Sequence, residues 1–143
     1  MFTGAHYHNL EAKGRLAIPA AYREKLTSGG VITVGLDGCL FLFPNSYWLE
    51  LSEKLANLPL TNQLARQFTR LLVQSASELD LDSQGRTLIP DNLKKSASLK
   101  KQVVVAGALT RIEIWDREAY HQHLNLITQE NPDWQKSLGE LNI

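Results

Sequence analysis

The sequence predicts an α+β fold built by tandem duplication, and three repeated features support this prediction. The stretch EAKGRLAIP at residues 11–19 recurs as DSQGRTLIP at residues 82–90, with glycine, arginine, isoleucine and proline in register. A β-branched run at residues 31–34 recurs at residues 103–105. An amphipathic helical pattern follows each run. A repeat of this length indicates one structural unit per copy, with the core shared between copies.

The repeated motif predicts a tight hairpin turn in each copy. Asp82 and Gly85 fit a type I turn in which the closing glycine takes a positive φ and the carboxylate accepts a backbone N–H bond. We therefore expect residues 78–81 and 86–89 to pair with each other as a hairpin. In the first copy Glu11 replaces the aspartate, and its extra methylene moves the carboxylate away from the local N–H. We expect either a looser first turn or an ion pair between Glu11 and Arg15.

Short helices, further strands and a longer helix follow each turn. Pro19 and Pro90 fit the first position of short helices over residues 20–26 and 91–97, where a missing N–H costs nothing. Two strands joined by a glycine-containing turn come next. The residues expected to cap the longer helices are Asn45 or Ser46, Thr61 and Asp116.

These patterns divide the chain into four segments. We expect a first repeat at residues 1–58, a connecting helix within 59–75, a second repeat at 76–130 and a tail at 131–143. The two repeats should form one interlocked domain. Apolar residues in the tail suggest a short docked helix or arm.

Composition limits the classes of function. Fifteen basic residues balance fifteen acidic ones, so any claim of nucleic-acid binding needs a local argument. The lone Cys39 excludes an intrachain disulfide and suits a reducing cytoplasm. The longest apolar runs are far too short to span a bilayer, so no membrane contact is expected.

Several motifs, in order along the chain, resemble the MraZ family. They are MFTG at residues 1–4, KGR at 13–15, LDGCL at 36–40, RLL at 70–72, DSQGR at 82–86 and IEIW at 112–115. The family is similar in fold to the SpoVT-AbrB superfamily, in which swapped hairpins interlock into a small β-barrel. The resemblance implies a tandem duplicated swapped-hairpin barrel with peripheral helices.

The resemblance also implies a function. It implies a sequence-specific DNA-binding transcriptional regulator, located in the cytoplasm on the nucleoid. Family members assemble as rings and bind direct repeats upstream of their own operon, in the division and cell-wall gene cluster. The expected partners are therefore double-stranded DNA and further copies of the same chain.

The first turn carries the strongest candidates for DNA contact. Arg15 can grip a phosphate, or guanine O6 and N7 in the major groove, which admits a two-stranded ribbon. Lys13 suits a phosphate because its ammonium is a compact point charge. Gly14 completes this tip. Arg23 on the following helix either flanks the same face or lies on an ordinary solvated helix surface.

The second turn offers Gln84 and Arg86, since glutamine can read adenine. Local charge separates the turns, because residues 11–25 carry a net charge of +2 and residues 78–86 carry −2. We therefore expect the first turn to contact DNA and the second to serve structure or assembly. Glu11, Asp82 and Gly85 are the expected turn-positioning residues. The four lysines of residues 94–101 fit an ordinary solvated face.

Other classes of function find less support. His6 and His8 share one face of a strand, but with Cys39 they make only a weak metal signal, and no metal or cofactor is expected. The chain has no nucleophile elbow and no P-loop, so neither catalysis nor a small-molecule substrate is expected. The main alternative is an antitoxin-like interaction or scaffold module, in which the turn arginines pair with acids of a partner.

Overall fold

Strands from the two repeats are interleaved in one antiparallel sheet of six strands. The computed structural model describes all residues, 1–143. The sheet order is β1-β7-β8-β4-β3-β5. The bounds in that order are Ala5–Asn9, Gln102–Gly107, Ile112–Asp116, Leu40–Pro44, Gly30–Val34 and Ser77–Glu78. A second sheet pairs β2 (Arg15–Ala17) with β6 (Arg86–Leu88). The fold is therefore α+β with antiparallel sheets, as predicted.

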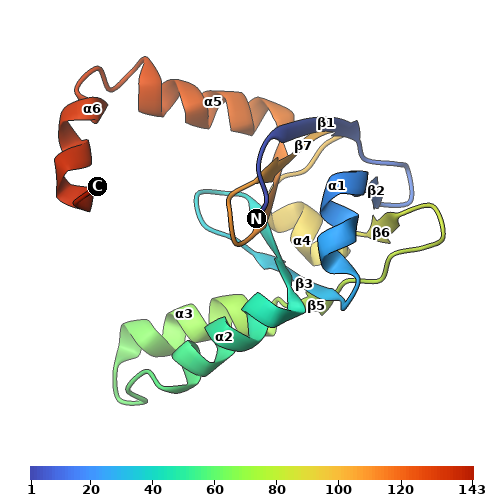
Figure 1. Ribbon diagram of the computed structural model, residues 1–143, viewed down its shortest axis with the longest axis horizontal. Helices are drawn as coiled ribbons and strands as arrows, with labels where there is room; N and C mark the ends of the chain where they lie inside the picture. The colour runs from blue at the N-terminus through green and yellow to red at the C-terminus, as the bar shows by residue number, and fades with distance from the viewer.

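Helices lie around the sheets and extend beyond them at two places (Figure 1). The short helices are α1 (Ala20–Arg23), which continues as η1 (Glu24–Leu26), and α4 (Asp91–Ser96). The longer helices are α2 (Asn45–Ala56), α3 (Gln63–Gln74) and α5 (Arg117–Thr128). The chain ends with α6 (Trp134–Ser137) and η2 (Leu138–Leu141). None of these helices has the length and apolar character needed to cross a bilayer.

The helix starts agree only partly with the expected caps. Asp116 caps α5 as predicted, because its carboxylate accepts the backbone N–H of Ala119 at 3.3 Å. The cap of α3 is Asn62, one residue beyond the expected Thr61. Helix α2 has no side-chain cap, because Pro44 occupies the N-cap position and Asn45 is the first helical residue. Asn45 donates its amide to the Ser28 carbonyl at 2.7 Å.

The predicted pairing within each hairpin is wrong beyond the turn. Strand β5 pairs with β3 of the first repeat, and β6 pairs with β2. Only an isolated bridge between Leu81 and Thr87 joins the two sides of the second turn. Both repeats carry the same strand pattern, so a strand finds an equivalent partner in the other copy. Each copy therefore completes the sheets of the other.

The expected closed barrel is not formed. β1 and β5 are the two free edges of the six-stranded sheet, and β2–β6 is a separate ladder. Each strand of that ladder ends just before an Ile-Pro pair, at Pro19 or Pro90. Proline has no N–H to donate, so the ladder ends there.

The main core lies between the two sheets, with α1 and α4 closing it. It contains fifteen buried apolar residues from both repeats, among them Leu16, Leu93 and Ile114 at 0% exposure. A smaller aromatic cluster of Phe43, Trp115 and their neighbours covers the opposite face of the large sheet. Burial on both faces explains why β4 reads as a continuous apolar run, Leu-Phe-Leu-Phe. Each fully buried aliphatic side chain stabilises the fold by about 1.5–3 kcal/mol.

The N-terminal segment fits closely over β7. Phe2 is buried and exchanges two backbone hydrogen bonds of 2.9 Å with Leu109. Gly107 lies directly beneath it, and a Cβ at that position would stand 2.4 Å from the Phe2 carbonyl carbon and the Thr3 nitrogen. Backbone atoms held by this bridge cannot move aside as a flexible side chain could.

We expect Gly107→Ala to lower the free energy of unfolding by about 1–3 kcal/mol, the usual cost of overpacking. Gly139→Ala is the matched control, because nothing lies within 4 Å of a Cβ there. It should change stability by no more than about 0.5 kcal/mol. Urea unfolding followed by circular dichroism measures both variants, and equal stabilities would contradict the close approach.

Candidate nucleic-acid interface

The β2–β6 ladder places the two motif arginines on one face. In its register Arg15 lies opposite Leu88, and Ala17 lies opposite Arg86. Residues directly opposite in an antiparallel pair point to the same side, and side chains alternate along each strand. Leu16 and Thr87 therefore face the core, where both are buried. Arg15 and Arg86 share the outer face.

Both turns have the backbone that the sequence predicts. Gly14 and Gly85 have φ values of 81° and 76°. In each turn this glycine donates its N–H to the carbonyl of Glu11 or Asp82, at 2.8 and 3.0 Å. Each turn is also tied to the other repeat, since Ile18 donates to the Gly85 carbonyl and Ile89 to the Gly14 carbonyl. The tips are therefore held firmly at their bases.

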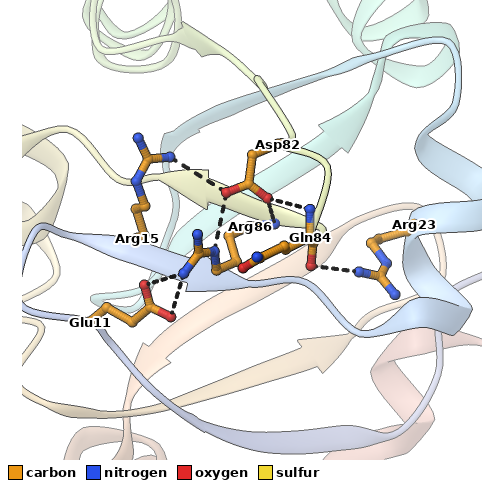
Figure 2. A network of polar contacts seen from close by, with 6 residues as sticks. All are labelled: Glu11, Arg15, Arg23, Asp82, Gln84 and Arg86. Atoms are coloured by element: carbon orange, nitrogen blue, oxygen red, sulfur yellow. Dashed lines mark hydrogen bonds and ion pairs between the residues drawn. The ribbon is translucent and has the colours of Figure 1, made fainter.

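Asp82 organises the second turn as predicted (Figure 2). Its Oδ1 accepts the backbone N–H groups of Gln84 at 2.8 Å and Arg86 at 2.9 Å. The bond from the Arg86 backbone is the main reason that the pKa of Asp82 is lowered, and the Arg86 side chain adds to it. The carboxylate is thus fixed in its charged form.

Arg86 is committed to acids of its own chain (Figure 2). Its Nη1 donates to both Glu11 carboxylate oxygens at 3.2 and 3.0 Å, and its Nε donates to Asp82 Oδ2 at 3.1 Å. The hydrogen bonds to Glu11 and then to Asp82 raise the pKa of Arg86. The expected pairing of Glu11 with Arg15 is wrong, because the longer glutamate side chain reaches across to the other repeat.

Arg15 is left largely uncommitted. Its nearest acid is Asp82 Oδ2 at 3.8 Å from Nη1, and its side chain makes no hydrogen bond and is 42% exposed. In Figure 2 this long contact to Asp82 is the one dashed line that reaches its guanidinium. Lys13 is exposed at the tip of the same turn and has no ion pair. A shallow hollow of about 390 Å³ lies between these two cations and Arg86.

Because β2 and β6 pair across the repeats, the cations beside each turn come from the other repeat. Arg23 lies against the second turn, not the first, and its Nη1 donates to the Gln84 carbonyl at 3.1 Å. The cation beside the first turn is Lys94, whose Nζ lies 2.9 Å from where a Cβ of Gly14 would stand and pairs with Asp91 Oδ1 at 2.8 Å. Sequence reasoning missed Lys94, although the repeat pairs it with Arg23 and so could have identified it.

Further charges near the turns follow the same asymmetry. The backbone of Lys101 accepts the N–H of Leu10 at 2.7 Å, which places that lysine next to the segment that enters the first turn. Exposed Glu78 and Asp80 occupy the segment that enters the second turn. The first turn therefore lies in a basic neighbourhood and the second in an acidic one.

The histidines and the cysteine considered for a metal site do not form a cluster with other metal-binding side chains. No three His, Cys, Asp or Glu side chains gather to hold a metal ion. Cys39 is buried and donates to the Leu36 carbonyl at 3.2 Å, and burial raises its pKa to about 12. His6 packs edge-on against the Tyr22 ring.

Comparisons with known proteins agree with the duplication. The model of a family described as MraZ protein, antitoxin-like, matches residues 1–71 and again 72–137. The chain is 45% identical to the Transcriptional regulator MraZ of Moorella thermoacetica over 140 residues, 98% of this chain and 95% of that protein. It is 46% identical to the protein of that name from Clostridium acetobutylicum over 143 residues, the full length of both.

We expect Asp82→Asn to destabilise the protein at pH 7, because asparagine cannot offer a charged partner to Arg86. A lowered pKa contributes stability that is present above the unfolded value of about 3.9 and is lost as the pH falls through the folded value. The difference from the unchanged protein should therefore shrink below about pH 4. Asp80→Asn, which removes an exposed acid without an ion pair, is the control. Urea unfolding at pH 7 and pH 3 measures this, and a difference independent of pH would contradict the assigned role.

Proposed function

We propose that this chain, which belongs to the MraZ family, is a transcriptional regulator that binds double-stranded DNA through its first turn. The observation that carries the proposal is the contrast between the two motif arginines. Arg86 donates three hydrogen bonds to acids of its own chain, whereas Arg15 donates none. One guanidinium supports the turns and the other remains available to a ligand.

The geometry of the first turn suits the major groove. The β2–β6 ladder that carries Arg15 is a two-stranded ribbon, which that groove admits, and an arginine there can grip guanine O6 and N7 with two parallel bonds. A turn tied down by backbone bonds at its base holds Arg15 in place before binding, which lowers the entropy lost on contact. Lys13 at the tip meets a phosphate, and Gly14 keeps the tip narrow. Lys101, which has no ion pair, adds positive charge behind it, whereas Lys94 is paired with Asp91.

The second turn supports the first in this proposal. Glu11 and Asp82 hold Arg86, and Arg23 lies over Gly85, so most of its charged groups are already paired or covered. Gln84 keeps an exposed side chain there, and an amide is the group that can contact adenine. Its acidic surroundings make it a secondary contact.

One copy offers too few cations for tight binding, so we propose that several copies act together. Each neutralised phosphate adds only about −0.9 to the salt slope on B-DNA. Linked sites raise avidity by roughly 10²–10⁴ without any new contact. A ring would match a target of repeated boxes at helical-turn spacing, such as direct repeats upstream of the chain's own operon in the division and cell-wall cluster. The site of action is then the nucleoid in the cytoplasm.

The repeats at residues 1–58 and 76–130 act as one interlocked unit in this assembly, joined through 59–75. The family is one of regulators and not of enzymes. A scaffold role, in which turn arginines bridge protomers, is less well supported. Arg86 already has its acids within its own chain, which leaves Arg15 alone for such a bridge.

We expect Arg15→Ala to weaken binding to the upstream direct repeats by about 1–3 kcal/mol per contact, with little change on a scrambled duplex. Loss of a base-reading group lowers the specific affinity more than the non-specific one. Lys54→Ala removes an exposed cation of α2 without an ion pair and is the control. Fluorescence anisotropy gives the affinities and light scattering the oligomer size. Unchanged specificity, or dissociation of the oligomer by Arg15→Ala, would refute this role.

We expect Lys13→Ala to weaken binding to the upstream repeats and to the scrambled duplex by the same factor. A phosphate contact carries no sequence information, and its loss should make the salt slope shallower by about 0.9 for each bound protomer. Titrations between 50 and 200 mM salt, a range of about fourfold, measure that slope. If the variant loses more affinity for the upstream repeats than for the scrambled duplex, Lys13 contacts a base and not a phosphate.

A further inference from the structure

The last part of the chain forms an arm with an uncovered apolar face. We define the C-terminal arm as residues 129–143, carried by α5. Trp134, Leu138 and Leu141 follow one another at spacings of four and three, which places them on one side of α6 and η2. Leu141 is 64% exposed, and α5 itself buries no residue. Figure 1 shows α5 leading the arm away from the sheets.

A groove of matching character lies between α2 and α3. It has a volume of about 460 Å³ and is lined mainly by apolar residues, including Leu55, Leu58 and Leu60. Leu60 is 83% exposed at the connection between the two helices. A contiguous exposed apolar patch, in contrast to a single exposed leucine, often marks an interaction surface.

The charges on the two surfaces are opposite. Arg66 and Arg70 line one side of the groove, and neither has a carboxylate partner. The arm carries three acids and one lysine, a net charge of −2. Its lysine, Lys136, already pairs with Asp133 at 3.4 Å. Glu140, between the apolar residues of η2, therefore remains for a cation outside the arm.

We propose that the C-terminal arm of one copy docks into the α2–α3 groove of a second copy. Leu138 and Leu141 enter the groove, and Glu140 meets Arg70 at its side. An amphipathic helix that inserts residues at spacings of three and four into an apolar groove is a recurring mode of recognition. The groove within the same chain is out of reach in this structure, since α6 stands well apart from α3 (Figure 1).

The arm and the groove are different surfaces, so the contact is head-to-tail. A head-to-tail contact closes into a ring when its rotation permits and continues as a filament when it does not. This inference rests on the proposed self-assembly and names the surfaces that would produce it. It concerns none of the residues assigned to DNA.

Charge reversal tests the contact. We expect Arg70→Glu and Glu140→Arg each to raise the protein concentration at half-assembly by about tenfold or more, because like charges then face each other. The double variant should regain the original size. Lys54→Glu, on α2 outside the groove, is the control. Light scattering after size-exclusion chromatography, over a range of concentrations, measures assembly.

Mixing the two single variants distinguishes contact between chains from contact within one. Each arm of one variant then finds an opposite charge in the groove of the other, so the mixture should regain full size. If only the double variant recovers, the arm binds its own groove and the proposal is wrong. If the unchanged protein assembles and neither single variant weakens it, other surfaces hold the assembly. If the unchanged protein is a monomer at every concentration, the proposed self-assembly fails as well.

Discussion

The antiparallel pairing of β2 with β6 is the constraint on which both turns depend. This ladder joins one strand from each repeat and sends Leu16 and Thr87 into the core. Packing therefore determines which face is left for Arg15 and Arg86. Because each turn is also bonded to the strand end of the other copy, neither tip is positioned by local sequence alone. The interface is a property of the interlocked pair.

The two turns share a motif but not an environment, and Glu11 accounts for much of the difference. Asp82 is short enough to bond the backbone of its own turn while it holds Arg86. The longer Glu11 side chain leaves its own turn and adds a second acid to the same arginine. Two acids thus serve one arginine. Divergence at one position of the duplicated motif thus accompanies a difference in pairing, with Arg86 held by two acids and Arg15 not hydrogen-bonded.

Local features such as turns and helix starts were predictable from the sequence. The pairing of strands and charged side chains between the repeats was not. The positive φ of Gly14 and Gly85, the short helices after Pro19 and Pro90 and the cap at Asp116 follow from residue chemistry within a few positions. Strand pairing does not, because two copies with one pattern offer two equivalent pairings, and only packing of the whole core selects between them. The same exchange of strands between the repeats explains why Arg23 lies against the second turn and not the first, why Lys94 lies beside the first turn, and why Glu11 reaches beyond its own turn.

The interleaved sheet has a consequence for synthesis. While the first repeat emerges from the ribosome, β3 and β4 can pair only with each other, because their outer partners β5 and β8 are not yet made. Long-range strand pairing is slow, and unpaired edges on nascent chains invite misassembly with other chains. A shorter, unduplicated chain of this design would have needed a second polypeptide to complete its sheets. Fusion of the two copies turns that encounter into a single-chain event, independent of how many molecules are present.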